Sequence, residues 1–298
     1  MRRCLIFNPV ARGGKAKLLG RHLKSVALEC DLCPTTGPGG GRVLAANAVK
    51  EGVETIIAAG GDGTVNEVLN GIGDVPGGFE RVCLGVLPIG TINVFARELG
   101  LPSRFDAAWT VLQKGREKQI DLPYAEFSLN GRSERRYFIQ LGGAGLDSRA
   151  IELVSWKLKQ KIGPLAYIVA GIKAFLETHM QIIAGDAGGG TNDSGELVLF
   201  GNGRFYGGSY AFFPKASLTD GLLDACVFPK TGWGTVFRVA FGMASGDPNR
   251  FAKVKQFQTS EFYLKSASRT MLELDGENVG ELPARISLLP KALRVIVP

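Results

Sequence analysis

Short apolar runs alternate with helical periodicity along the first 100 residues. The runs predict buried strands, and segments whose apolar positions recur every three or four residues predict the helices between them. The expected strands cover residues 4–7, 55–59 and 82–87, together with a short strand that ends at residue 33. The expected helices cover residues 43–49, 65–72 and 94–99, together with a helix that follows the turn 10–16 and extends to about residue 27. Strands that alternate with helices predict a parallel sheet with its ligand crevice at the carboxyl ends of the strands.

From residue 121 onward the pattern changes to short strands separated by glycine turns. The expected strands cover residues 137–140, 197–200, 211–213, 223–228, 256–264, 270–274 and 293–297. They predict an antiparallel, sandwich-like arrangement. A helical insert is expected at residues 150–179, and the small polar residues 186–195 predict a surface loop. We therefore expect a parallel-sheet α/β domain over residues 1–120 and a β-rich domain over residues 121–289.

One glycine-rich turn lies between the strand at 55–59 and the helix at 65–72. Its sequence is Gly60-Gly61-Asp62-Gly63-Thr64-Val65-Asn66-Glu67. A strand, a glycine-rich turn and a helix N-terminus form an anion site, because glycines let the backbone approach and the first N–H groups of the helix are free. Asp62 is unusual there, since a carboxylate repels phosphate unless it binds a metal ion or meets a hydroxyl. The alternative is a tight turn in which Asp62 caps a helix.

Two further polar turns follow strands in the same half. They are Val10-Ala11-Arg12-Gly13-Gly14-Lys15-Ala16 and Pro88-Ile89-Gly90-Thr91-Ile92-Asn93. Because all three turns follow parallel strands, we expect one crevice to collect them. The sequence contains neither Gly-x-Gly-x-x-Gly nor a Walker A motif, so a nucleotide site here would belong to another class.

Composition and charge narrow the class of partner. The 298 residues are 45% hydrophobic and 21% charged, as in an ordinary soluble globular protein. The net charge of +7 favours anionic partners. No lysine- and arginine-rich block with interleaved aromatics occurs, so nucleotide phosphates and an anionic membrane face suit this charge better than nucleic acid. The longest apolar tract, residues 165–176, is too short to span a bilayer, and no secretory signal precedes the first strand.

The five cysteines are odd in number and scattered along the chain. Cys30-x-x-Cys33 has no second pair and no histidine cluster beside it, which argues against zinc. A redox role for this pair stays open. Reduced core thiols of a cytosolic protein are the expected state.

Three segments carry a specific combination of motifs. They are Gly60-Gly61-Asp62-Gly63-Thr64-Val65-Asn66-Glu67-Val68-Leu69-Asn70-Gly71, Leu87-Pro88-Ile89-Gly90-Thr91-Ile92-Asn93-Val94-Phe95-Ala96-Arg97, and Asn8-Pro9 with Gly13-Gly14-Lys15-Ala16. Together they resemble the signatures of the diacylglycerol kinase/sphingosine kinase catalytic domain family, in particular its soluble bacterial lipid kinases. The resemblance covers nearly the whole chain. It implies an N-terminal α/β nucleotide-binding domain, to which residues 290–298 return, and a β-rich lipid-binding domain across a cleft.

The resemblance also implies a reaction and a place. The enzyme would transfer the γ-phosphoryl group of ATP to a lipid hydroxyl, with magnesium, as a cytoplasmic protein peripheral to the inner face of the membrane. Backbone N–H groups of Gly61, Gly63 and Thr64 would hold phosphate, and Asp62 would bind the nucleotide's magnesium or orient the acceptor hydroxyl. The remaining residues expected at the nucleotide are Asn8, Lys15, Thr35, Val65, Asn66, Glu67 and Thr91.

Two motifs of the second half complete the implied site. Leu274-Asp275-Gly276-Glu277 matches the family's Asp-Gly-Glu motif, so Glu277 would be the catalytic base that accepts the hydroxyl proton. The segment around Asp220-Gly221 matches a motif that holds a structural magnesium in bacterial members. The expected ligands are the Asp220 side chain and two backbone carbonyls, from Ser217 and Leu222. Val94 departs from the family pattern, because many relatives have there an aspartate linked to that metal through waters.

Two other functions fit part of the sequence. One is a soluble-substrate kinase of the NAD kinase type, which shares part of the central signature. The other is a non-catalytic lipid-binding protein on the kinase fold. The Thr91-Ile92-Asn93 segment and the C-terminal motifs disfavour the first, and retention of the acidic residues Asp62, Glu67 and Glu277 disfavours the second. No motif names the lipid or sets the oligomeric state.

Overall fold

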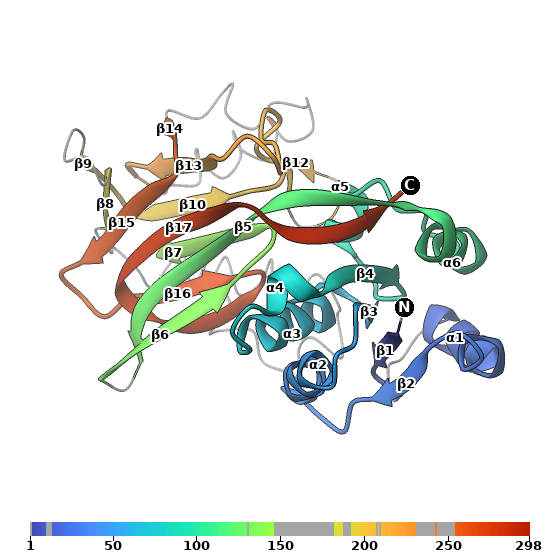
Figure 1. Cartoon of the computed structure of the whole chain (residues 1–298). Coiled ribbons are helices and arrows are strands. Elements are labelled where there is room, and N and C mark those ends of the chain that lie inside the picture. The colour runs from blue at the N-terminus through green and yellow to red at the C-terminus, as the bar shows by residue number, and fades with distance from the viewer. Residues whose placement is uncertain are drawn as a thin grey trace.

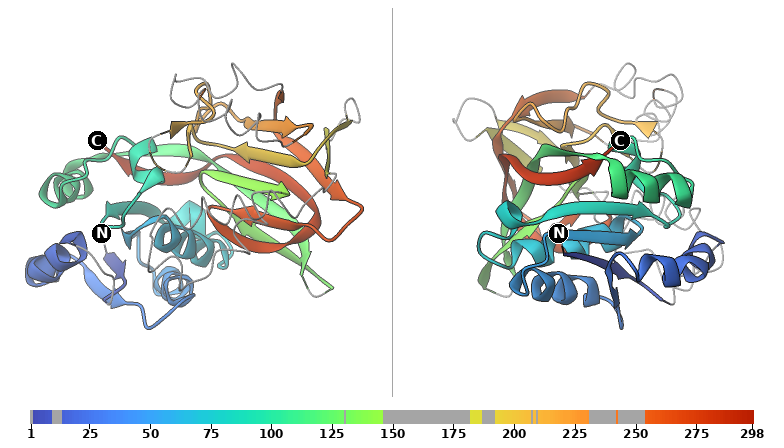
Figure 2. Two further views of the ribbon diagram at one scale, coloured as in Figure 1. Left: turned by 180° about the vertical axis from the view of Figure 1, so that it is seen from behind. Right: turned by 45° about the vertical axis from the view of Figure 1, so that its right-hand side comes forward.

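A computed structural model describes residues 2–9, 14–129, 131–145, 182–186, 192–206, 208, 210–230, 242 and 254–298. The helical insert expected at 150–179 lies outside the described residues. Figures 1 and 2 show a helix-flanked half, which carries both chain termini, and a β-rich half. Two long strands, β5 (Arg116–Leu129) and β17 (Glu277–Val297), run side by side from one half to the other.

Four parallel strands form the sheet of the first half, in the order β4-β3-β1-β2. They are β1 (Arg3–Phe7), β2 (Asp31–Pro34), β3 (Thr55–Gly60) and β4 (Cys83–Pro88). The helices are α1 (Gly14–Val26), α2 (Gly40–Lys50), α3 (Asp62–Gly73), α4 (Gly78–Arg81), α5 (Val94–Glu98) and α6 (Phe105–Lys114). The expected parallel-sheet α/β half is confirmed.

Apolar side chains cover both faces of this sheet, because successive residues of a strand point to opposite faces. Ile56 and Ala58 of β3 belong to a core cluster that includes the buried faces of α2 and α3. Ile57 and Ala59 belong to a second cluster with residues of α1 and α6. A strand buried on both sides has no polar face, which explains the uninterrupted apolar run that predicted β3.

The β-rich half consists of antiparallel pairs among its described strands. Its larger strands are β6 (Arg132–Tyr137), β7 (Leu141–Gly145), β8 (Ile182–Asp186), β9 (Asn192–Gly195), β10 (Leu197–Gly201), β13 (Leu223–Phe228), β14 (Lys255–Thr259), β15 (Glu261–Ser266) and β16 (Met271–Leu274). A short hairpin pairs β11 (Phe205–Tyr206) with β12 (Tyr210–Ala211). The core contains Phe138, Phe200 and Phe262, packed edge to face with ring centroids 5.3–5.6 Å apart.

Strand β17 joins the two halves into one sheet. Its first part pairs with β16 and β15, and it is antiparallel to β5 along most of its length. Near its end, Arg294 and Val295 pair in parallel with Cys83 and Leu84 of β4. The sheet order β16-β17-β4-β3 therefore passes from one half into the other without a break. The expected boundary at residues 120/121 falls inside β5, and the division into two domains stays a prediction.

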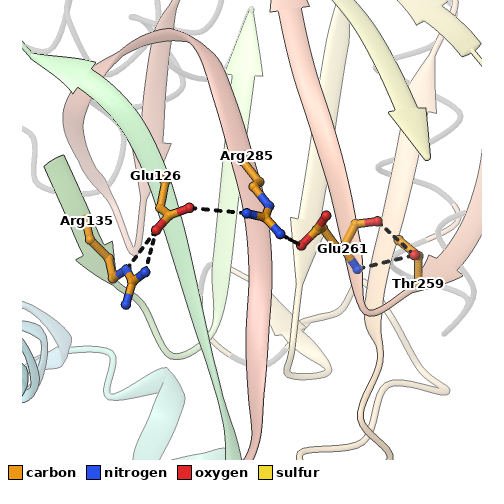
Figure 3. A network of polar contacts seen from close by, with 5 residues as sticks. All are labelled: Glu126, Arg135, Thr259, Glu261 and Arg285. Carbon is orange, nitrogen blue, oxygen red and sulfur yellow. Dashed lines mark hydrogen bonds and ion pairs between the residues drawn. The ribbon is translucent and has the colours of Figure 1, made fainter. Parts of the chain in front are cut away.

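Charged side chains link neighbouring strands on one face of the β-rich half (Figure 3). Glu126 of β5 accepts a hydrogen bond from Arg135 of β6 at 3.0 Å, and its other oxygen lies 3.7 Å from Arg285 of β17. Arg285 also pairs with Glu261 of β15. Opposite charges facing each other across strands contribute roughly 0.2–1 kcal/mol per pair and disfavour a shifted register.

Two expected strands in this half were partly wrong. Residues 137–140 mostly form the connection between β6 and β7, because the N–H groups of Ile139 and Gln140 donate to the Asp275 carboxylate and not to a neighbouring strand. In the segment 211–213, strand β12 ends at its first residue. The next two side chains, Phe212 and Phe213, turn inward and are buried in an apolar cluster.

Three further differences concern element boundaries. Residues 256–264 form two strands that meet at a turn, where the Thr259 hydroxyl accepts the Glu261 N–H and donates to the Glu261 carbonyl. Both ends of the expected loop 186–195 belong to paired strands, β8 and β9, because their backbone groups bond to each other. Helix α6 was not expected, although its buried residues Phe105, Ala108 and Leu112 recur at helical spacing.

The packing of α3 on α2 generates a stability prediction. A Cβ on Gly71 of α3 would lie 2.1 Å from the Arg42 carbonyl oxygen of α2, so Gly71→Ala forces the helices apart. We expect the free energy of unfolding, measured by urea denaturation, to fall by about 1–3 kcal/mol. The control is Gly20→Ala in α1, where no atom lies within 4 Å and alanine should be neutral or stabilising by about 0.5–1 kcal/mol. Equal effects of the two substitutions would contradict this packing.

Candidate active site

The N-terminus of α3 lies at the central glycine turn, where the sequence predicts an anion site. Strand β3 ends at Gly60, and the N-cap Gly61 has an extended backbone with no side-chain hydrogen bond to cap the helix among the described residues. The N–H groups of the first helical turn have no partner inside their own helix. Gly63 is exposed, and Thr64 is half-buried. This end of α3 therefore presents backbone donors and a positive dipole end to a ligand.

The second signature packs directly against this turn. The N–H groups of Ile89 and Gly90 both donate to the Gly60 carbonyl oxygen, at 3.2 and 3.1 Å. A Cβ on Gly90 would lie 2.4 Å from the Gly61 Cα, so the two turns can touch only because this position is glycine. The close approach brings exposed Thr91 beside the α3 N-terminus.

Asp62 holds the two signatures together. Its carboxylate oxygens accept the N–H groups of Val94 at 3.0 Å and Phe95 at 3.1 Å, the first residues of α5. The Asp62 carboxylate therefore caps α5, a helix other than its own, and its expected role at the nucleotide stays a prediction. The carboxylate also stands in the first turn of α3, where the helix dipole stabilises negative charge.

Glu67 anchors the loop that follows β2. Its two oxygens accept the N–H groups of Gly39 and Gly41, both at 2.8 Å, at the start of α2. Thr35 begins this loop, is 9% exposed, and donates its backbone N–H to the Phe7 carbonyl at 2.8 Å. Glu67 therefore positions the segment that carries Thr35, and both its oxygens face backbone donors.

The Asp275-Gly276-Glu277 turn is fixed by its aspartate. Three consecutive N–H groups donate to the Asp275 carboxylate at 2.8, 2.9 and 3.2 Å, from Ile139, Gln140 and Leu141. A fourth donor is the Asn66 side-chain amide of α3, at 2.9 Å. Burial raises the pKa of the Asp275 carboxyl, and these hydrogen bonds act in the opposite direction. The backbone φ of Asp275 is +48°, a left-handed conformation that aspartate adopts more readily than most residues.

This turn places Glu277 at the N-terminus of α3, where the anion site is predicted. A Cβ on Gly63 would lie 4.0 Å from the Glu277 Oε1, so the carboxylate of the β-rich half stands at the first turn of α3. Glu277 is exposed, whereas Asp275 two residues earlier is held on the protein side of the turn. Asn70 adds a second connection, since its amide donates to the Tyr137 carbonyl and accepts the Tyr137 N–H, both at 3.0 Å.

Comparison with known proteins bears on this geometry. The diacylglycerol kinase catalytic domain family matches residues 2–125, and the YegS C-terminal NAD kinase beta sandwich-like domain matches residues 142–297. A diacylglycerol kinase of Staphylococcus saprophyticus is 30% identical over 99% of this chain and 94% of its own length. This chain belongs to the diacylglycerol kinase family.

Other relatives agree with this assignment. A diacylglycerol kinase of Staphylococcus carnosus is also 30% identical, over 99% of this chain and 94% of its own. A crystal structure of a diacylglycerol kinase from Bacillus anthracis str. Sterne superposes with a TM-score of 0.75 at 25% identity, covering 100% of this chain and 97% of that one. Another crystal structure from the same strain gives 0.79 at 24% identity, covering 100% and 95%. The α/β half followed by a β-sandwich-like half is thus the fold of this kinase family.

The remaining expected nucleotide residues lie in different environments. Asn8 directly follows β1 and is exposed. Lys15 lies in the first turn of α1, and its side chain is outside the described part. Val65 is 2% exposed in the core between α2 and α3, so only its backbone is available to a ligand. The roles of these residues stay predictions.

The expected structural magnesium motif forms a tight loop. Asp220 is exposed, and its Oδ1 accepts the Leu222 N–H at 3.1 Å, while the Ser217 hydroxyl oxygen accepts the Thr219 N–H at 3.3 Å. Burial raises the pKa of nearby Asp224, a hydrogen bond from Gln258 lowers it, and the charge of Asp220 raises it further. Carboxylate, hydroxyl and carbonyl oxygens are the donors that magnesium prefers, and this set fits it. Within the described ranges, no group of three or more His, Cys, Asp and Glu side chains could hold a metal, so phosphate, carbonyl or water oxygens would complete any magnesium site.

Asp121 is a positioning residue that the sequence analysis did not single out. It is 1% exposed, and its carboxylate accepts the Gly221 N–H at 2.7 Å and the Lys291 N–H at 2.8 Å. Asp121 therefore holds three segments together: β5, the loop of the magnesium motif, and the part of β17 around Lys291. The sequence signal that could have identified Asp121 is an acidic residue inside the apolar run Ile120-Asp121-Leu122. A carboxylate buried in a strand requires hydrogen-bond donors around it.

Glu98 is a second such residue. Its side chain is 4% exposed and accepts both the backbone N–H and the Nε of Arg204, each at 2.8 Å. The pair links α5 of the first half to the segment before β11. No local sequence pattern indicates this ion pair, because Glu98 and Arg204 lie 106 positions apart in the sequence.

The enclosed Asp275 carboxylate generates a stability prediction. Asp275→Asn places an NH₂ group against backbone N–H donors, and each buried group left unpaired costs about 1–3 kcal/mol. We expect the free energy of unfolding to fall by about 2–4 kcal/mol in urea denaturation. The control is Asp106→Asn, an aspartate of α6 whose side chain is 74% exposed, with an expected change within about 0.5 kcal/mol. A wild-type stability of Asp275→Asn would show that this carboxylate does not fasten the turn.

Proposed function

We propose that this family member is an ATP-dependent lipid kinase. It transfers the γ-phosphoryl group of ATP to the hydroxyl of a diacylglycerol-like or sphingoid-like lipid at the inner membrane face. The observation that carries the proposal is the position of the Glu277 carboxylate, 4.0 Å from a Cβ placed on Gly63 at the uncapped N-terminus of α3. A carboxylate beside a phosphate site needs a proton to accept or a cation to hold, and an acceptor hydroxyl supplies the proton.

Each group has a separate task in this proposal. The N–H groups of Gly61, Gly63 and Thr64 bind the phosphates. As the hydroxyl oxygen attacks the γ-phosphorus, Glu277 accepts the hydroxyl proton, the bond from the γ-phosphorus to the bridging oxygen of the β-phosphate breaks, and ADP leaves. Asp62 keeps the Gly90 turn against α3 through its bonds to α5. Magnesium, when bound, would neutralise charge on the transferred phosphoryl group. Asp62 would also hold the nucleotide's magnesium or orient the acceptor hydroxyl, and Ser217, Asp220 and Leu222 would hold a structural magnesium.

Two observations support a lipid acceptor. The staphylococcal relatives are named diacylglycerol kinases. The net charge of +7 favours an anionic membrane face. Within the described ranges, no helix combines the length and apolarity needed to cross a bilayer. A phosphoryl acceptor with apolar tails would then be reached from the membrane surface.

A second candidate is a soluble-substrate kinase of the NAD kinase type. The observation that favours it is the match of residues 142–297 to a domain described as NAD kinase beta sandwich-like. The match of residues 2–125 to the diacylglycerol kinase catalytic domain favours the lipid acceptor instead.

The role of Glu277 is tested by Glu277→Gln. Loss of the proton acceptor should lower kcat by about 10²–10⁴-fold with little change in the KM for ATP. Because Glu277 is exposed, the free energy of unfolding should stay at the wild-type value. The measurement is kcat for phosphorylation of a short-chain diacylglycerol in mixed micelles, beside a urea denaturation curve.

The control is Glu281→Gln, on the same strand and also near the surface, where the carboxylate pairs with Arg269. It should retain wild-type kcat. Asp62→Asn should also abolish turnover, and it should lower stability by about 1 kcal/mol because a helix cap is weakened. Full activity of Glu277→Gln would remove the proposed base.

The acceptor class is tested with labelled ATP, magnesium and total membrane lipid extract. We expect label in a lipid that migrates as a phosphatidic acid or another phosphorylated lipid alcohol. NAD is assayed in parallel under the same conditions. Label in NADP with none in the lipid fraction would replace the lipid kinase with the soluble-substrate kinase, and binding of lipid vesicles without turnover of ATP would indicate the non-catalytic alternative.

A further inference from the structure

Two cysteines from different strands lie in contact at the edge of the α/β sheet. The Sγ atoms of Cys4 in β1 and Cys33 in β2 are 3.0 Å apart. Cys4 is 1% exposed, and Cys33 is half-buried. In the parallel register Cys33 lies opposite Ile6, so the two cysteines occupy neighbouring positions on the same face. Both contribute to the core cluster beneath α2.

The spacing Cys30-x-x-Cys33 does not describe this pair. Cys30 belongs to the cluster on the opposite face of the sheet, with residues of α1 and α6. Residues that flank a strand on opposite faces cannot join their sulfurs without moving the backbone. The thiol partner of Cys33 is therefore Cys4, which stands 29 positions earlier in the sequence.

The five thiols, all in the described part of the chain, differ in reactivity. Burial raises the pKa of Cys30 to about 11 and the pKa values of Cys83 and Cys226 to about 12. The hydrogen bond to Cys33 raises the pKa of Cys4, and the same hydrogen bond lowers the pKa of Cys33. A lowered pKa with partial exposure is typical of thiols that react with oxidants.

We propose that Cys33 is an oxidation site and that Cys4 is its resolving partner, with a hydroperoxide as the oxidant. The Cys33 thiolate attacks one peroxide oxygen and the O–O bond breaks, which gives a sulfenic acid and releases water or an alcohol once the leaving oxygen takes up a proton. The Cys4 sulfur then attacks the Cys33 sulfur, the S–O bond breaks, and water leaves with the Cys4 proton. Two thiols are oxidised by two electrons to one disulfide, and one peroxide is reduced.

The disulfide would fasten an edge strand beside the nucleotide site. Strand β2 has four residues and pairs only with β1 among the described strands. The next residue after β2 is Thr35, whose N–H is bonded to β1. The inference is independent of the lipid kinase proposal, because it rests on sulfur geometry and not on turnover.

The test is peptide mapping of the whole reduced chain after limiting hydrogen peroxide and quenching with N-ethylmaleimide. We expect a linked peptide pair containing Cys4 and Cys33, lighter than the separate peptides by two hydrogens, and restoration of both free thiols by dithiothreitol. Cys30, Cys83 and Cys226 should carry the alkylating group only after denaturation. A Cys30–Cys33 link, or unmodified Cys33 at a peroxide dose that oxidises free cysteine, would overturn the proposal.

Two variants separate the resolving role from simple proximity. Cys30→Ser should form the Cys4–Cys33 link at the wild-type rate. Cys4→Ala should remove the link and leave Cys33 to accumulate as sulfenic and sulfinic acid, which dimedone trapping and mass spectrometry detect. If Cys4→Ala lowers thermal stability, Cys4→Val provides a second apolar replacement of similar shape. Equal sulfinic acid yields in wild type and both Cys4 variants would show that Cys4 does not resolve the sulfenic acid.

Discussion

The Asp275 carboxylate is the point on which the candidate active site depends. It is enclosed by four donors, three from the N–H groups of residues 139–141 and one from Asn66 of α3. A buried carboxylate costs several kcal/mol unless such donors surround it, so the arrangement tolerates little displacement. The constraint acts on Glu277, which follows two residues later. With Asp275 fixed to α3, Glu277 stands at the first turn of that helix, where the phosphate-binding N–H groups are predicted.

The same arrangement, a carboxylate that accepts backbone N–H groups, occurs at other positions in the candidate site. Asp62, Glu67 and Asp121 each accept two backbone N–H groups from residues distant in the sequence. Loops carry few apolar contacts, so hydrogen bonds to charged acceptors, worth about 1.5–3 kcal/mol each, provide the order that a packed core provides elsewhere. The sheet is continuous through β17 and β4, and these carboxylates hold the loops in fixed positions relative to it. The candidate site is therefore built from backbone donors held at fixed positions.

Much of the fold could be predicted because it depends on local pattern. Apolar runs predicted the parallel strands, and three-to-four spacing predicted α3 and its neighbours. Prediction was wrong where a distant partner decides the local structure. Residues 137–140 have the composition of a strand, but Asp275, more than 130 positions away, accepts the N–H groups of Ile139 and Gln140. The motif Asp275-Gly276-Glu277 pointed to Glu277 through family resemblance, whereas no periodicity pointed to Asp121 or Glu98. Likewise the spacing of Cys30 and Cys33 suggested a pair that the two faces of the sheet keep apart.

The most direct test of this account is a crystal structure with magnesium and a non-hydrolysable ATP analogue. The account predicts the phosphates at the N–H groups of Gly61, Gly63 and Thr64. It also predicts that the Glu277 carboxylate lies on the γ-phosphate side, with room for one acceptor hydroxyl between the carboxylate and the γ-phosphate. The hydrogen bonds to Asp275 should remain intact. A triphosphate bound elsewhere, or a γ-phosphate too far from Glu277 for a single acceptor hydroxyl to bridge, would contradict it.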